Sequence, residues 1–169
     1  MVVYSKILLV EGRQDVRVIP ELIEANKITW EINNQPVVYI QEHGGYENLA
    51  DPDVISTYLQ ARSLTALGII IDADDNPLER WQSIRNSCSK SIPNLPELLP
   101  KSGLVHTAEN DIKFGIWMMP DNKMQGMLET FLAYIIPSQD EQLWQFAQET
   151  VQQAKDMGAS FRGCMRSQN

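Results

Sequence analysis

Short apolar runs alternate along the chain with stretches whose apolar residues recur at helical spacing. The apolar runs predict strands at 7–10, 37–40, 67–71, 104–107 and 114–119. The amphipathic stretches predict helices at about 16–26, 52–62, 76–86, 127–136 and 140–157. Because strands and helices alternate, we expect an α/β protein with a central, mostly parallel sheet flanked by helices.

Local signals refine these elements. The run Ile7–Val10 is apolar throughout, which is typical of a strand covered on both faces. Asn76-Pro-Leu-Glu79 offers an N-cap and a proline at the first helical position, and Gly158 is suited to end the last helix. We expect the last two strands to form an antiparallel hairpin, and the Ser-, Pro- and Asn-rich stretch 87–102 to be a loop.

Length and charge limit the possible functions. A chain of 169 residues is most simply a single domain, 1–169, with its own core. Its 22 acidic and 14 basic residues give a net charge of −8, which argues against a nucleic-acid coat protein or a polybasic membrane binder. No apolar run approaches the ~18–20 residues of a membrane span, no signal peptide opens the chain, and the two cysteines suggest no disulfide framework. We therefore expect a cytoplasmic protein.

Acidic residues follow three of the predicted strands. Glu11, Asp72 and Asp121 each come at or just after a strand end. Carboxyl ends of parallel strands meet at one edge of a sheet, so these three acids are expected to converge there. Further acids lie close by in sequence, at Asp15, Asp74 and Asp75. Clustered carboxylates repel one another, and Mg²⁺ or Mn²⁺ is the usual ion that offsets this repulsion. Helix caps and loop hydrogen bonds explain single aspartates equally well.

Two motifs carry a family resemblance. Ile7-Leu-Leu-Val-Glu-Gly-Arg-Gln-Asp15, followed by Gly68-Ile-Ile-Ile-Asp-Ala-Asp74, resembles the TOPRIM domain of topoisomerases, bacterial primases and nucleases of the overcoming-lysogenisation-defect (OLD) type. The segment from Phe114 to Glu129 is similar to part of a small stand-alone TOPRIM-like family of undefined activity. The resemblance covers roughly residues 5–161 and implies a TOPRIM-like, Rossmann-like sheet.

The resemblance also implies roles for individual residues. Glu11 corresponds to the general acid or base, and Asp72 and Asp74 correspond to a pair that holds Mg²⁺ or Mn²⁺. Asp121 and Glu129 look like the additional acids of the OLD branch, which makes them candidates for a second metal. The remaining positions are supporting: Gly12 for a sharp turn after the first strand, the Gly44-Gly45 turn after the second strand, and the nearby acids Asp15 and Asp75.

These matches imply metal-dependent phosphoryl transfer, with nucleic acid phosphodiesters as the expected substrate and a nucleotide phosphate as another. Arg13 and Lys123 are candidates to bind phosphate. Arg17, Arg80 and Arg85 also flank the acidic motifs, although solvated helix faces account for such arginines as well.

The chain departs from the family pattern in two ways. It has no room for the separate domain that carries the tyrosine nucleophile of a topoisomerase. Relatives of the stand-alone type continue past the position of Arg166-Ser167, so the domain is expected to be truncated at its C-terminus relative to them.

Other classes of function stay open. A catalytically weak metal-binding or regulatory module could use the same scaffold, because fold does not dictate function. A receiver-like phosphate switch would also place acids at strand ends, but Ile116 occupies the position where its phosphoacceptor aspartate is expected. A dehalogenase-type phosphatase uses Asp-x-Asp, but normally on its first strand. A partner protein or a homo-oligomer could supply the basic surface that the chain lacks.

Overall fold

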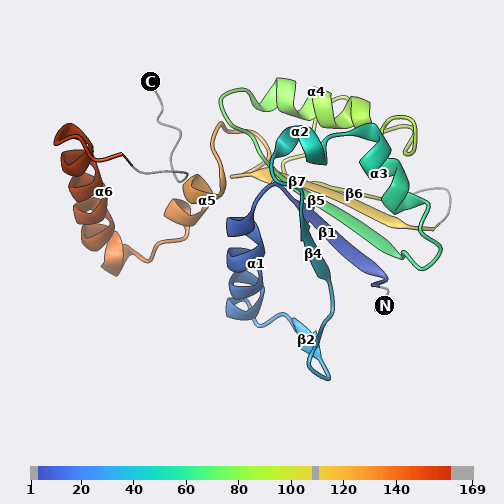
Figure 1. Ribbon diagram of the computed structural model, residues 1–169, viewed down its shortest axis with the longest axis horizontal. Coiled ribbons are helices and arrows are strands. Elements are labelled where there is room, and N and C mark those ends of the chain that lie inside the picture. Colours follow the sequence, from blue (N-terminus) through green and yellow to red (C-terminus); the bar gives the residue numbers. More distant parts are fainter. Residues whose placement is uncertain (1–3, 108–110, 161–169) are drawn as a thin grey trace. The chain divides into compact units, whose positions relative to one another are not determined.

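The computed structural model describes residues 4–107 and 111–160. A five-stranded sheet in the order β4-β1-β5-β7-β6 forms its centre (Figure 1). The strands β4, β1, β5 and β7 are parallel, and β6 pairs antiparallel with β7 at one edge. The strands are β1 Lys6–Val10, β4 Tyr39–Glu42, β5 Ala66–Asp72, β6 Leu104–Thr107 and β7 Lys113–Met119.

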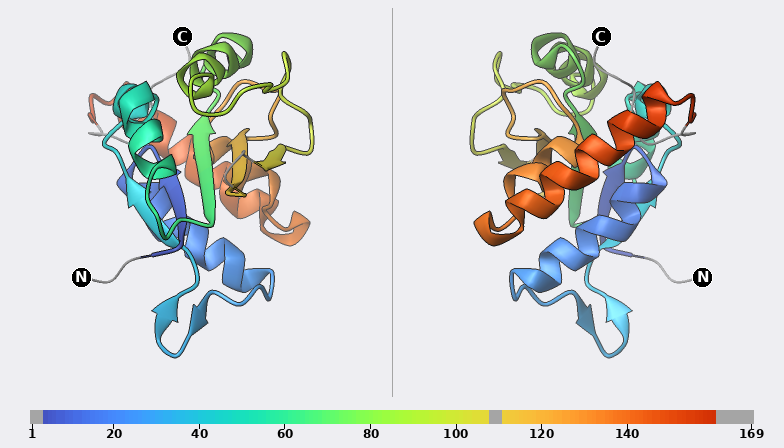
Figure 2. Two further views of the ribbon diagram at one scale, coloured as in Figure 1. Left: turned by 90° about the vertical axis from the view of Figure 1, so that its right-hand side faces the viewer. Right: turned by 90° about the vertical axis from the view of Figure 1, so that its left-hand side faces the viewer.

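Helices cover both faces of this sheet (Figures 1 and 2). Helix α1 lies on one face, and α2, α3 and α4 lie on the other. Their bounds are α1 Arg13–Ala25, α2 Tyr46–Leu49, α3 Pro52–Leu59 and α4 Pro77–Cys88. The mixed α/β fold with a mostly parallel central sheet is therefore confirmed.

Side-chain alternation explains why both faces are covered. In β1, Leu9 packs with the larger core cluster, whereas Val10 packs with Ile19 of α1. In β5, Ile69 belongs to the larger cluster and Ile70 contacts the smaller one. Successive residues of a strand point to opposite faces, so an entirely apolar strand needs helices on both sides.

The predicted strands are all present, but the second is displaced. Strand β4 covers 39–42 rather than 37–40, because the Val37 N–H donates to the Trp30 carbonyl at 2.8 Å and closes a small hairpin. That hairpin, β2 Glu31–Ile32 with β3 Gln35–Pro36, was not predicted. Its turn residues Asn33 and Asn34 both have positive φ, and asparagine tolerates this region.

The predicted helices also form, with small changes. Helix α3 ends at Leu59 rather than 62, and α4 runs to Cys88, two residues into the expected loop. Pro20 lies inside α1 without ending it. The four-residue α2 was not predicted, since it is too short to show helical periodicity.

The chain divides into two compact units, Met1–Phe131 and Leu132–Asn169. Helix α5, Leu128–Tyr134, spans the division. The second unit contains the short 3-10 helix η1, Ser138–Asp140, and α6, Glu141–Asp156. Across residues 4–107 and 111–160, none of the helices has the length and apolar character needed to cross a membrane.

Candidate functional site

The connections of the sheet diverge at one point of its carboxyl edge, between β1 and β5. The chain leaves β1 through α1 to reach β4 on one side, and it leaves β5 through α4 to reach β6 and then β7 on the other. Ligands in open α/β sheets bind where neighbouring strands diverge in this way. Glu11 directly follows β1 and Asp72 is the last residue of β5, so these two acids flank the divergence.

Glu11 is fixed at both its side chain and its backbone. Its Oε1 accepts a hydrogen bond from the Asp72 N–H at 2.8 Å. Its carbonyl oxygen accepts one from the Gly45 N–H at 2.8 Å. Glu11 therefore joins the ends of β1 and β5 to the turn after β4. Burial raises its pKa above the usual range for a glutamate; the Asp72 N–H and the nearby Arg80 guanidinium oppose this effect.

Asp72 lies where several negative charges meet. Its Oδ1 accepts a hydrogen bond from the Leu128 N–H at the start of α5, at 3.0 Å. Burial raises its pKa to about 7, with further contributions from the charges of Glu11, Asp15 and Glu129. Deprotonation of Asp72 therefore takes place near neutral pH.

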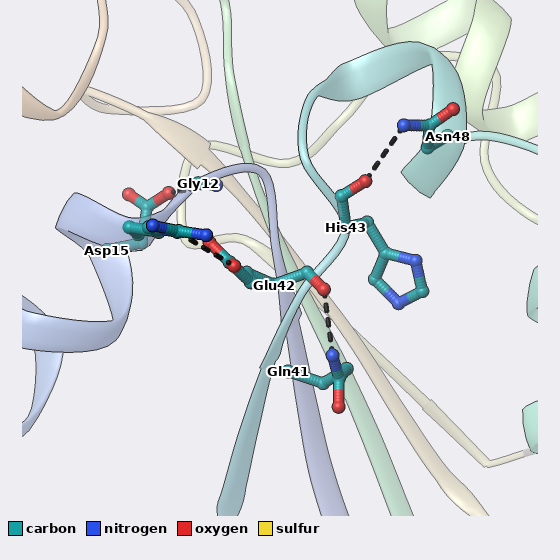
Figure 3. Close-up of polar contacts among 7 residues, drawn as sticks. Gly12, Asp15, Gln41, Glu42, His43 and Asn48 are labelled. Atoms are coloured by element: carbon teal, nitrogen blue, oxygen red, sulfur yellow. Dashed lines mark hydrogen bonds and ion pairs between the residues drawn. The ribbon is translucent and has the colours of Figure 1, made fainter.

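Asp15 and Glu129 belong to the same group of charges. The Asp15 side chain is 9% exposed and accepts the Gly12 N–H at 2.9 Å (Figure 3). Burial raises the pKa of Asp15, and the negative charge of Glu129 raises it further. We call Glu11, Asp15, Asp72 and Glu129 the acidic cluster. Two of its members, Asp15 and Glu129, come from the first turns of α1 and α5.

The expected reason for Gly12 is wrong. Its φ of −141° is ordinary extended backbone, so no sharp turn requires a glycine there. A Cβ at Gly12 would meet only the Asp15 carboxylate, at 3.8 Å. The Gly44-Gly45 turn, in contrast, has φ of +70° and +125°, which favours glycine at both positions.

Asp74 is held by a different set of contacts. Its backbone exchanges two hydrogen bonds with Gly126, both at 2.9 Å. Its Oδ2 forms an ion pair with the Arg80 guanidinium. Its carboxylate thus already has a cationic partner, and the neighbouring Asp75 is exposed.

Asp121 caps its own turn rather than joining the acidic cluster through a hydrogen bond. Its Oδ1 accepts the N–H groups of Lys123 at 3.0 Å and Met124 at 2.8 Å. Asn122, only 3% exposed, accepts the Met118 N–H and donates to the Lys101 carbonyl, which fixes this turn to the end of β7. The Lys123 side chain is exposed.

Arg13, the other expected phosphate ligand, is 84% exposed at the start of α1. Its Nε lies 3.3 Å from Glu42 Oε1, at the end of β4. In Figure 3, Glu42 and Asp15 lie on one side of this strand end and His43 extends to the other. The structure thus places this predicted phosphate ligand at the start of α1, already paired with an acid.

The donor chemistry of the acidic cluster suits a hard cation. All of its side chains offer carboxylate oxygen, the ligand that Mg²⁺ and Mn²⁺ prefer. Within residues 4–107 and 111–160, however, no three acidic, histidine or cysteine side chains are placed to hold one ion together. The fold thus gathers the charge that a cation would neutralise, and a complete coordination sphere would need side-chain rearrangement or water ligands.

The sequence did not indicate Tyr46, and it named Arg80 only as one of several arginines that flank the acidic motifs. Arg80 was equally compatible with a solvated helix face, yet its side chain is only 16% exposed and lies over the Tyr46 ring. The position of Arg80 in the sequence could have indicated this contact. Side chains in the first turn of a helix point back toward the segment before the helix, and here that segment contains the Asp-x-Asp motif.

The sheet order and the acids at the β1 and β5 ends define a Rossmann-like α/β protein with acidic residues at the carboxyl edge of its sheet. The chain belongs to the family described as "Protein of unknown function (DUF3226)", which matches residues 5–167. No curated protein and no solved structure matches the chain.

Proposed function

We propose that the protein is a divalent-metal-dependent phosphoryl-transfer domain of TOPRIM type that acts on phosphodiester bonds of nucleic acid. The observation that carries this proposal is the hydrogen bond between Glu11 Oε1 and the Asp72 N–H at the divergence of β1 and β5. It joins the two motifs that resemble TOPRIM, although 61 positions separate them in sequence.

Each residue of the acidic cluster has a role in this proposal. Asp72, with Asp15 and Glu129 nearby, would hold the metal, and a bound divalent ion would supply a lower pKa for its water and neutralise phosphate charge. Glu11 transfers a proton, because its raised pKa brings it closer to neutral pH than an exposed glutamate. Asp74 and Asp121 supply further oxygens only when their present contacts with Arg80 and the 121–124 turn are exchanged.

The test is a metal-dependent nuclease assay on single-stranded and duplex DNA and on RNA. We expect wild-type protein to cleave at least one of these with Mg²⁺ or Mn²⁺, and Glu11→Gln to lower the rate by at least about 100-fold. Glu24→Gln, an exposed acid on α1, is the matched control and keeps wild-type activity. Cleavage that survives in the Glu11→Gln, Asp72→Asn double variant would contradict the assignment.

Metal binding needs its own measurement. Titration calorimetry should detect Mg²⁺ or Mn²⁺ binding to wild type and to Glu24→Gln, with weaker binding to Asp72→Asn. An unchanged affinity in Asp72→Asn would remove Asp72 from the metal site, whatever the activity.

A second candidate is a catalytically weak metal-binding or regulatory module on the same scaffold. The ion pair between Asp74 and Arg80 favours it, since it leaves one of the two Asp-x-Asp carboxylates already neutralised. Metal binding without cleavage of any of the three substrates would select this candidate.

A further inference from the structure

Arg80 is a mostly buried cation whose charge acts on Glu11 of the acidic cluster. It lies in the first turn of α4, six residues after Asp74, and its side chain is 16% exposed while that of its partner Asp74 is 46% exposed. By contrast, Arg13 in the other ion pair between described residues is 84% exposed. Surface ion pairs contribute little, but a desolvated guanidinium is costly unless its hydrogen-bonding groups are used.

The surroundings of Arg80 hold its guanidinium in place. The Tyr46 ring lies beneath it, with 3.8 Å between the Arg80 Cζ and the ring centroid. The Tyr46 hydroxyl donates to the Arg80 carbonyl at 3.3 Å, and the Arg80 N–H donates to the Asn76 carbonyl at 3.0 Å. Stacking on the Tyr46 ring and the ion pair with Asp74 together orient the planar guanidinium of Arg80. A guanidinium can donate two parallel hydrogen bonds to phosphate oxygens as well as to carboxylate oxygens.

We propose that Arg80 is a phosphate-binding residue that exchanges partners: it pairs with Asp74 in the free protein and turns to a substrate phosphate when a divalent ion binds at the Asp-x-Asp motif. This inference rests on the proposed function. A metal and Arg80 compete for the same Asp74 carboxylate, so metal binding frees the guanidinium. By reciprocity, a phosphate that binds Arg80 makes Asp74 available and tightens metal binding.

The exchange makes a prediction that a purely structural role does not. Removing Arg80 removes the competing cation, so Mg²⁺ alone should bind more tightly, whereas phosphate should bind more weakly. A residue that only maintains the local structure would weaken both when it is removed. The substrate class is an anionic phosphate ester, and thymidine 5′-monophosphate serves as the probe.

The experiment measures Mg²⁺ affinity with and without thymidine 5′-monophosphate, and nucleotide affinity with and without Mg²⁺, by titration calorimetry on the full chain. In wild type we expect each ligand to tighten the other by about 10-fold. Arg80→Gln should bind Mg²⁺ alone about fivefold more tightly, bind the nucleotide at least about 10-fold more weakly, and lose the coupling.

Two variants complete the design. Arg80→Lys keeps the charge without the planar fork, so it should retain wild-type Mg²⁺ affinity while binding the nucleotide more weakly; it also keeps the test decisive if Arg80→Gln does not fold. Lys90→Gln removes one exposed positive charge two residues beyond the end of α4 and should match wild type in both affinities.

The outcomes separate the two proposals. Wild type that binds Mg²⁺, together with Arg80 variants that keep wild-type coupling or lose affinity for both ligands, would overturn the exchange and leave the proposed function standing. Wild type that binds no Mg²⁺ would overturn the proposed function and the exchange with it.

Discussion

At the scale of single residues, the acidic cluster stores unfavourable electrostatic energy. Asp72 is surrounded by the charges of Glu11, Asp15 and Glu129, and its pKa rises to about 7 from a usual value of 3.8. Functional sites commonly hold groups whose pKa is shifted in this way by burial and like charges. The consequence for stability follows from the direction of the shift.

The first prediction concerns pH in metal-free buffer. Between about pH 4 and 7 the folded state keeps the Asp72 proton that the unfolded state releases, so the free energy of unfolding falls as pH rises. Asp72→Asn removes this dependence. We expect the variant to be more stable than wild type by about 2–4 kcal/mol at pH 8, with the difference nearly absent at pH 4.

Urea denaturation in EDTA across this pH range measures the difference. A gap between the two proteins that stays constant with pH would contradict the electrostatic explanation. Added Mg²⁺ should stabilise wild type more at pH 8 than at pH 5, because the metal competes with the Asp72 proton.

At the scale of elements, the segments after β5 and β7 support each other through backbone contacts. Asp74 and Gly126 exchange two hydrogen bonds, and the Ala73 N–H donates to the Met119 carbonyl at 3.1 Å. Gly126 has φ of +138°, and a Cβ there would lie 2.7 Å from Thr130 Oγ1 in α5. Only glycine combines this backbone conformation with this close approach.

The second prediction therefore concerns Gly126→Ala. We expect it to lower the free energy of unfolding by about 2–4 kcal/mol, from backbone strain together with the displacement of Thr130. Gly45→Ala is the matched comparison: its φ is +125°, but a Cβ there meets no atom within 4 Å. It should cost about 1–2 kcal/mol, from the backbone alone. Equal losses in the two variants, measured by chemical denaturation, would show that the Thr130 contact does not matter.

At the scale of the whole molecule, the core is concentrated in the first unit. The larger cluster includes Leu67, Ile69 and Ile71 of β5, all 1% exposed. Helix α6 of the second unit has no buried residue, and Leu143 and Phe146 are 68% and 65% exposed. Stability in proteins follows buried apolar contact, so the two units are expected to differ.

The third prediction is a difference in amide hydrogen exchange. Amides of β5 and β7 should exchange only through global unfolding, whereas those of α6 should exchange by local opening, at least about 100-fold faster than the β5 amides. Mass spectrometry of peptides from the two regions measures this. Equal protection of α6 and β5 would mean that α6 is stabilised as strongly as the central sheet.

Much of the fold follows from the sequence by itself. The apolar runs determine β1, β5 and β7, because a strand that is covered on both faces needs apolar residues at successive positions. The cap at Asn76 determines the start of α4, since its side chain accepts the Glu79 N–H. Such signals are local, so they can be read without knowing what each element contacts.

Only the tertiary structure decides which partner each acidic side chain has. Asp72 and Asp74 are two positions apart, yet Asp72 lies among the other acids of the acidic cluster, whereas Asp74 pairs with Arg80. Sequence patterns place acids at strand ends, but the partner of each carboxylate depends on helices that approach from elsewhere in the chain. The sequence determines which residues reach the carboxyl edge of the sheet, and packing determines which charges meet there.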